Sequence, residues 1–143
     1  MDNDEKRLRH LEMIQSVISL MAQNSFSIKT WTVTLVAGLF ALAADKASPV
    51  FVLVAYIPLG AFWILDGYYL WQERLYRAYF DQTRQSAGVV DYSMDASGVS
   101  DRVDSWCAVA LSSTLRIFYG VLFVTILVVM LALVHMQGNC LKP

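Results

Sequence analysis

Charge is scarce in this chain. Of its 143 residues, 16% are Asp, Glu, Lys or Arg, whereas 57% are hydrophobic and the mean hydropathy is +0.47. A soluble domain of this size carries more charge. The length admits three or four membrane-spanning helices with short connections and leaves no room for a separate globular domain of ordinary size. We therefore predict an all-α, multi-pass membrane protein in which residues 1–143 form a single membrane domain.

Motifs that mark enzymes are also missing. The sequence has no Gly-rich phosphate loop, no HExxH, no GxSxG and no paired carboxylates within its apolar stretches. The only cysteines are Cys107 and Cys140, and the orientation argued below places them on opposite sides of the membrane, as it does His10 and His135. We therefore expect no enzymatic activity, no internal disulfide, no metal site and no cofactor.

The stretch 48–70 organises the chain. No charge occurs between Ala47 and Leu65, a length of about 28 Å as a helix, which is close to the roughly 30 Å hydrocarbon core of a bilayer. This stretch predicts a transmembrane helix, in which Pro58 removes one backbone hydrogen bond and favours a kink. Residues 71–85 predict a helical extension into the cytoplasm, whose apolar face needs a partner surface. Amphipathic aromatic rings gather at the transition, as is typical of a headgroup boundary: Trp63, Tyr68, Tyr69, Trp71, Tyr76 and Tyr79.

The amino-terminal part predicts two further helices. Residues 1–24 lack Gly and Pro and place apolar side chains at steps of three and four, a pattern that predicts an amphipathic helix. We expect this helix to lie on the inner membrane face or against the bundle; an oligomerising or gating helix is the alternative. The polar segment 24–27 predicts a boundary, after which 28–44 forms the first transmembrane helix, with Lys29 reaching toward the headgroups.

Small and hydroxylated side chains follow one face of this first transmembrane helix, at alternating spacings of three and four. We call this face the seam; it consists of Ser27, Thr30, Thr34, Ala37 and Ala41. Small residues allow helix backbones to approach closely, which favours a helix-packing surface. The alternative is a pore lining, because hydroxyl groups can replace part of the hydration of an ion.

Residues 86–104 form the only long irregular stretch and predict a cytoplasmic loop. Gly88 and Gly98 bracket a short alternating piece that predicts a hairpin. The loop carboxylates lack the Gly-centred spacing and the closing Glu of a calcium-binding loop, so we interpret them as solvated: Asp91, Asp95, Asp101 and Asp104.

Residues 105–136 predict one long helix that contains the third transmembrane helix. Its apolar run extends from Ile117 to Val134, and its one charge is Arg116. Basic residues near the ends of the predicted spans lie mostly on one side: Lys6, Arg7, Arg9, Lys29, Arg74, Arg77, Arg84, Arg102 and Arg116, against Lys46 and Lys142. This bias predicts a cytoplasmic amino terminus and a periplasmic or extracellular carboxyl terminus.

Asp66 is the one carboxylate within the apolar part of the second span. A carboxylate at a helix centre costs about 2.5 to 3.5 kcal/mol on insertion scales, and less near the boundary. Lys29 and Arg116 are predicted at the same depth, so we expect Asp66 to form a polar cluster with one of them. Such a pair fixes the register of the helices, or it belongs to a gate or an ion pathway.

The helical extension presents Arg74, Arg77 and Arg84 at spacings of three and seven. These residues follow the positive-inside bias of cytoplasmic segments. The alternative is an anion or nucleotide site, because guanidinium groups match phosphate geometry.

Several strings of residues in the first two-thirds of the chain carry a resemblance to a known family. The strings Ile14-Gln15-Ser16-Val17-Ile18, Met21-Ala22 and Asn24-Ser25-Phe26, with Lys29 and Trp31, come first. They are followed by Phe62-Trp63-Ile64-Leu65-Asp66-Gly67-Tyr68-Tyr69-Leu70 and by Glu73-Arg74 with Arg77. This pattern, over about residues 11–80 and again at Asp91–Asp95, resembles small bacterial membrane effectors of nucleotide-signalled anti-phage defence, of the Hailong type. The resemblance implies a bacterial inner-membrane channel that is controlled by the product of a nucleotidyltransferase.

We therefore expect an oligomeric, regulated pore that acts in anti-phage defence. The seam, the kinked helix and the apolar extension together present more surface than one copy can cover, so we expect a cyclic homo-oligomer, a tetramer. The expected partners are the lipid bilayer, a nucleotide or oligonucleotide ligand and a cytosolic signalling protein. The alternative is a non-conducting membrane anchor that recruits a cytosolic signalling enzyme through the extension and the loop.

Overall fold

The computed structural model describes residues 3–46, 48–85 and 92–140. Over these ranges the chain is helical, with no β-strand. Its elements are α1 (Asn3–Lys46), α2 (Pro49–Val54), α3 (Tyr56–Gln85), the 3-10 helix η1 (Ser97–Arg102), α4 (Trp106–Ala110) and α5 (Ser113–Cys140). Three stretches are long and apolar enough to cross a membrane: Asn3–Asp45, Val50–Gln85 and Ser113–Met136. The predicted fold class, an all-α membrane protein with three transmembrane helices, is confirmed.

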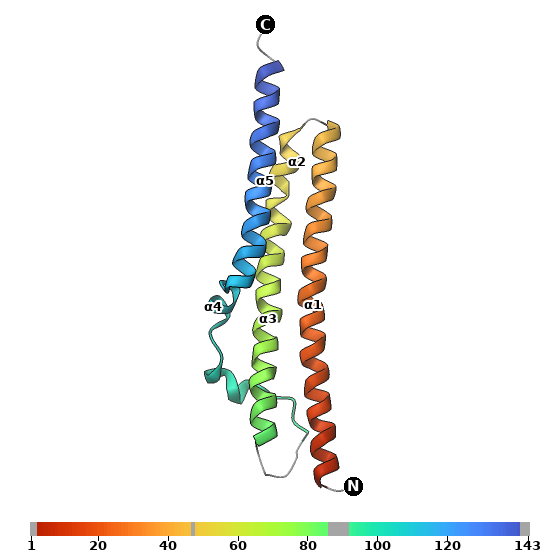
Figure 1. Cartoon of the computed structure of the whole chain (residues 1–143), viewed down its shortest axis with the longest axis vertical. Helices are drawn as coiled ribbons and strands as arrows, with labels where there is room; N and C mark the ends of the chain where they lie inside the picture. Colours follow the sequence, from red (N-terminus) through yellow and green to blue (C-terminus); the bar gives the residue numbers. More distant parts are fainter. Residues whose placement is uncertain (1–2, 47, 86–91, 141–143) are drawn as a thin grey trace.

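The amino-terminal prediction needs a correction, because α1 is one helix of 44 residues. The predicted amphipathic helix 1–24 and first transmembrane helix 28–44 are the two halves of this helix, and no boundary occurs at 24–27 (Figure 1). Neither Gly nor Pro interrupts the helix before Gly38. Ser25, a residue that competes with helix backbones when its hydroxyl has no other partner, instead directs its hydroxyl to Asp66 on α3. The polar segment therefore stays helical.

The second span is interrupted where Pro58 predicts it. Helix α2 ends at Val54 and α3 begins at Tyr56. The backbone N–H of Ala55 donates to the carbonyl of Val52, only three residues back, at 3.2 Å. Since Pro58 has no N–H to offer the carbonyl of Val54, the regular pattern of hydrogen bonds cannot continue through this turn. Beyond it, α3 runs unbroken through the predicted extension to Gln85.

The predicted single helix over 105–136 is also corrected, because a turn at 111–112 separates α4 from α5. Ser105 caps α4 by accepting a hydrogen bond from the N–H of Ala108 at 3.4 Å. The carbonyl of Ala110 accepts from the indole Nε1 of Trp63 at 2.8 Å, which gives this carbonyl a partner on α3 where the helix stops. An unbroken helix would not bring Ala110 to this partner.

The described part of the predicted loop, residues 92–104, packs on the extension of the second span. Residues 86–91 of the predicted hairpin lie outside the described part of the chain, and the part from 92 onward contains η1 rather than a strand. Ala96 and Val99 are buried together with Leu75 of α3. The apolar face of the extension is thus covered by the chain's own segment.

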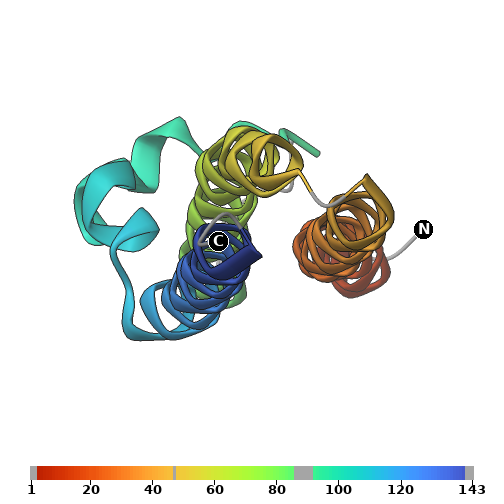
Figure 2. The ribbon, with the colours of Figure 1, turned by 90° about the horizontal axis from the view of Figure 1, so that it is seen from above.

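Helices α2 and α3 stack into one column, which α1 and α5 flank (Figure 2). The buried side chains between them come from all four helices: Val36 and Ala43 of α1, Val52 of α2, Leu59 of α3, and Leu115, Tyr119 and Ile126 of α5. The described amino-terminal end of α1, the carboxyl end of α3 and η1 lie at the same end of the molecule (Figure 1). This arrangement brings three helices together around Asp66.

Candidate functional site around Asp66

Asp66 is fully buried, with 0% of its surface exposed, and it accepts hydrogen bonds from two neighbouring helices. Its Oδ1 atom lies 2.5 Å from the Ser25 hydroxyl and 2.8 Å from Nζ of Lys29, both on α1. Its Oδ2 atom lies 2.6 Å from the same Nζ and 3.1 Å from the hydroxyl of Tyr119 on α5. We call these four residues the Asp66 cluster. It joins α1, α3 and α5 through one carboxylate.

The spacing of residues on each helix explains this geometry. Ser25 and Lys29 are one helical turn apart, so their side chains lie on the same face of α1, and Nζ of Lys29 also donates to the Ser25 hydroxyl at 2.8 Å. On α5, the Tyr119 hydroxyl lies within reach of both Asp66 and the carbonyl of Phe62, which is 3.2 Å away and one turn earlier on α3. Each polar atom of the cluster therefore has a partner.

The contacts of the Asp66 carboxylate offset the cost of its burial. A buried carboxylate is costly unless it is paired and its remaining lone pairs accept hydrogen bonds, and the Asp66 cluster meets both conditions. The Lys29 side chain is 22% exposed, so its ammonium group lies at the edge of the packed interior. The pair thus joins α1 to α3. The two interpretations of Asp66, a contact that fixes helix register and a gate, stay predictions.

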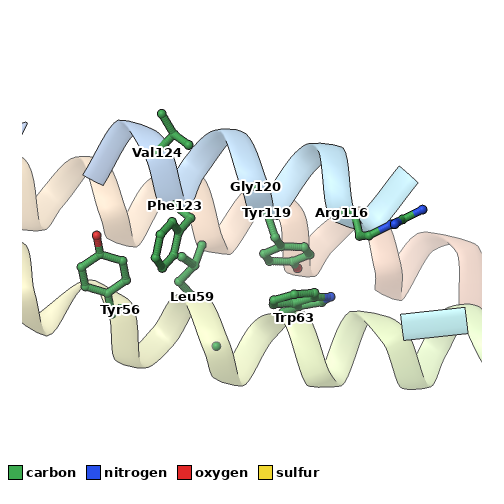
Figure 3. A pocket seen from close by; sticks show the side chains of 9 residues that line it. Tyr56, Leu59, Trp63, Arg116, Tyr119, Gly120, Phe123 and Val124 are labelled. Atoms are coloured by element: carbon green, nitrogen blue, oxygen red, sulfur yellow. The ribbon is translucent and has the colours of Figure 1, made fainter. Parts of the chain in front are cut away.

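Of the two predicted basic partners, the structure pairs Asp66 with Lys29 and not with Arg116. Arg116 is exposed on α5 and forms no ion pair with any described residue. It lies about one helical turn before Tyr119, at the edge of the space between α3 and α5 (Figure 3). The predicted cluster is therefore corrected to contain Ser25 and Tyr119 in place of Arg116.

Sequence reasoning missed Ser25 and Tyr119, although the sequence carried a signal for each. Ser25 precedes Lys29 by four residues, the spacing that places two side chains on one helix face. Tyr119 is the one tyrosine within the apolar run from Ile117 to Val134. A phenolic hydroxyl in such a run usually needs a hydrogen-bond partner, and Asp66 is the carboxylate available.

The seam does not pack within the chain. Its members all lie on the exposed face of α1: Ser27, Thr30, Thr34, Ala37 and Ala41. The face that packs against α3 instead carries Ser25, Ile28, Thr32 and Val36. Thr30 and Thr34 donate their hydroxyl hydrogens to the backbone carbonyls of Phe26 and Thr30, which leaves their oxygen lone pairs facing outward. A role for the seam between copies of the chain, as contact or as lining, stays a prediction.

The three arginines predicted as an anion or nucleotide contact are each paired with a carboxylate. Arg77 bonds to Glu73 at 2.7 Å, Arg74 approaches Asp104 at 3.6 Å, and Arg84 approaches Asp81 at 3.7 Å. The three arginine side chains are 39% to 62% exposed. A phosphate ligand would have to displace these carboxylates.

A second cluster ties the amino-terminal end of α1 to the segment after α3. His10 is buried, and its Nε2 atom lies 2.9 Å from the carbonyl of Ser93, which also accepts from the hydroxyl of Tyr79 at 2.7 Å. Next along the chain, hydrogen bonds from the side chain and backbone of Ser97 lower the pKa of Asp95 below its usual 3.8. The segment 92–97 is therefore held by α1 and α3 together.

Comparison with known proteins finds no matching family model, no matching curated protein and no matching solved structure. Within the described ranges, no group of three His, Cys, Asp or Glu side chains is placed to hold a metal ion. The chemistry available is that of the Asp66 cluster on the packed face of α1 and of the seam on its exposed face.

Proposed function

We propose that this chain is an oligomeric membrane effector: a regulated pore or ion channel that acts in anti-phage defence under the control of a cytosolic nucleotide signal. The proposed location is a bacterial inner membrane, with the amino terminus in the cytoplasm and the carboxyl terminus in the periplasm or outside the cell. The resemblance over residues 11–80 supports the nucleotide control and the role in defence.

The observation that carries the pore proposal is the exposure of the seam, which lies on the face of α1 turned away from the Asp66 cluster. Ser27, Thr30 and Thr34 face away from the chain's own core at the depth where a lipid-facing helix is usually apolar. Copies of the chain arranged around an axis would bring their seams together, and the outward hydroxyl oxygens would then line a narrow polar path.

The cluster offers a route by which a cytosolic event would reach this lining. Lys29 lies between seam residues Ser27 and Thr30 in the sequence, and its Nζ holds Asp66 of α3. A ligand that repositions the extension of α3 would change this contact and, through it, the orientation of the seam. A difference of about 1.4 kcal/mol in binding to the two states shifts their ratio tenfold.

The arginines of the extension supply the ligand chemistry. Exposed ion pairs such as Arg74 with Asp104 and Arg84 with Asp81 contribute about 0 to 1 kcal/mol each. A phosphate group forms stronger, bidentate hydrogen bonds with guanidinium, so it would compete for these side chains. We propose Arg74, Arg77 and Arg84 as contacts for a nucleotide or oligonucleotide.

The competing function is a non-conducting anchor that recruits a cytosolic enzyme. It loses support from the packing of the extension, because Ala96 and Val99 already cover the apolar face around Leu75. A recruited protein would therefore need a different, more polar surface.

Conductance of the purified chain in planar bilayers, with and without candidate nucleotides, tests the proposal. We expect nucleotide-dependent currents that change when Thr34→Leu removes a seam hydroxyl. Thr125→Leu is the matched control, because Thr125 is also exposed and also donates to the carbonyl four residues back. Silence under every condition, with co-purification of a cytosolic protein, would favour the anchor. Equal effects of the two substitutions on conductance would show that the seam does not line the pore.

A further inference from the structure

A groove in the membrane-spanning part of the molecule opens between α3 and α5. It has a volume of about 530 Å³, and aromatic and aliphatic side chains form its walls (Figure 3). Tyr56 and Phe123 meet with ring centroids 5.0 Å apart, and Trp63 stacks on Tyr119 at 5.9 Å. The groove is thus an apolar surface, with a single charged residue, Arg116, among those that line it.

A second apolar groove, of about 420 Å³, lies on the neighbouring face of α5. Arg116, Gly120 and Val124 line both grooves. These three residues span about 12 Å along α5, so the two grooves run side by side from the same guanidinium toward the middle of the span. Gly120 has no side chain, so little separates the two grooves at this position.

Among the described residues, Arg116 forms no ion pair. Asp66 is buried and paired with Lys29. Asp45 lies at the far end of α1, and α5 has no carboxylate. An unpaired arginine at the edge of an apolar layer favours an anion from the surrounding lipid.

We propose that Arg116 and its two grooves bind one diacyl phospholipid of net negative charge. The guanidinium would hold the headgroup phosphate through parallel hydrogen bonds, and one acyl chain would occupy each groove. A diacyl phospholipid carries one phosphate and two apolar chains, and the protein offers one guanidinium and two apolar grooves. This site is separate from the seam, and it does not depend on conduction.

Gly120 provides a position from which a side chain can fill the grooves. A Cβ atom built on Gly120 has no heavy atom within 4 Å, so the first atom of a larger side chain meets no neighbour. Gly38 on α1 is equally open but borders neither groove. A larger side chain at Gly120 therefore fills the proposed lipid site, whereas the matched substitution at Gly38 does not.

Native mass spectrometry of the full chain, titrated with dioleoyl phosphatidylglycerol or dioleoyl phosphatidylcholine, tests the proposal. We expect wild type to bind phosphatidylglycerol more tightly, and Arg116→Gln to weaken that binding about fivefold and remove the preference. Gly120→Leu should weaken binding of both lipids, whereas Gly38→Leu should bind like wild type.

Three outcomes would overturn the lipid site. The first is equal binding of the two lipids by wild type, and the second is full lipid binding by Gly120→Leu. The third is a smaller assembly of Gly120→Leu in light scattering with lipid binding retained, which would assign the grooves to a neighbouring copy of the chain.

Discussion

At the scale of single residues, the stability of the helix packing around Asp66 depends on how many hydrogen bonds its carboxylate accepts. Its two oxygens accept from Ser25, Lys29 and Tyr119, so no lone pair is left for water. Removing the charge of one partner therefore exposes the other to the full cost of burial without a counter-charge. Two substitutions separate the contribution of the ion pair from that of the hydroxyl.

Asp66→Asn should lower the free energy of unfolding by about 3 kcal/mol or more, because Lys29 loses its counter-charge. Thermal or denaturant unfolding of the protein in detergent measures this change. The double substitution Asp66→Asn with Lys29→Met should recover part of the loss. Asp81→Asn is the control, since Asp81 forms only an exposed contact with Arg84 at 3.7 Å, and it should stay within about 0.5 kcal/mol of wild type.

The same substitution distinguishes the two interpretations of Asp66. Reduced stability with unchanged conductance per assembled complex supports a role in helix register. Wild-type stability with altered conductance or toxicity would instead assign Asp66 to the gate. Wild-type values in every measurement would contradict both.

Tyr119→Phe should lower the free energy of unfolding by about 1.5 to 3 kcal/mol, the range for a hydrogen bond to a charged group. The ring remains to stack on Trp63, so the substitution removes only the hydroxyl contacts to Asp66, Phe62 and Thr32. Tyr68→Phe is the matched control, because its hydroxyl bonds only to Gln72 on the surface. Equal effects of the two substitutions in unfolding measurements would contradict the role given to Tyr119.

The sequence predicted part of this site. Asp66 was predictable because a carboxylate beside an apolar run is rare, and Lys29 because it lies at the same predicted depth. The choice between Lys29 and Arg116 depends on the rotation of α1 and α5 about their axes, which the spacing of charges does not determine. For the same reason, the side of α1 on which the seam lies was not predictable.

At the scale of elements, the helix ends follow local backbone chemistry. The interruption at Ala55 was predictable because Pro58 lacks an N–H. The turn between α4 and α5 was not, because it accompanies a tertiary contact from Trp63 to the carbonyl of Ala110. The continuity of α1 was missed because the Ser25 hydroxyl finds its partner on another helix.

Gly67→Ala should lower the free energy of unfolding by about 1 to 3 kcal/mol, as overpacking usually does. Helix α4 approaches α3 so closely that a Cβ atom at Gly67 would lie 2.9 Å from Cβ and 3.1 Å from Cα of Ala110. Gly38→Ala is the control; its Cβ would meet nothing within 4 Å, and alanine favours a helix over glycine. A Gly67→Ala protein as stable as the Gly38→Ala protein would show that α4 does not pack in this way.

At the scale of the whole molecule, one copy leaves much of its apolar and hydroxylated surface uncovered. The exposed seam on α1 is the clearest case. We expect light scattering of the detergent-solubilised protein to give a mass of several chains, a tetramer in the proposed arrangement. A monomer at every concentration would contradict the assembly and, with it, the pore.

The proposed orientation predicts which of the two cysteines a reagent outside the cell can reach. A membrane-impermeant thiol reagent added to intact cells should modify Cys140 and spare Cys107, although Cys107 is exposed in the folded chain. Labelling should disappear in Cys140→Ser and persist in Cys107→Ser. The reverse labelling pattern would show that the orientation is inverted and that Arg74, Arg77 and Arg84 do not face the cytoplasm.

Because α1 is unbroken, it can tilt as one rigid rod. Its 44 residues measure about 66 Å, more than twice the roughly 30 Å hydrocarbon core. For a rigid tilt of α1 about the pair of Lys29 and Asp66, the arm toward Asn3 would measure about 39 Å and the arm toward Lys46 about 26 Å. A tilt of roughly 5° would move the Asn3 end by about 3 Å. The shorter arm, which carries most of the seam, would swing the opposite way through about two-thirds of that distance.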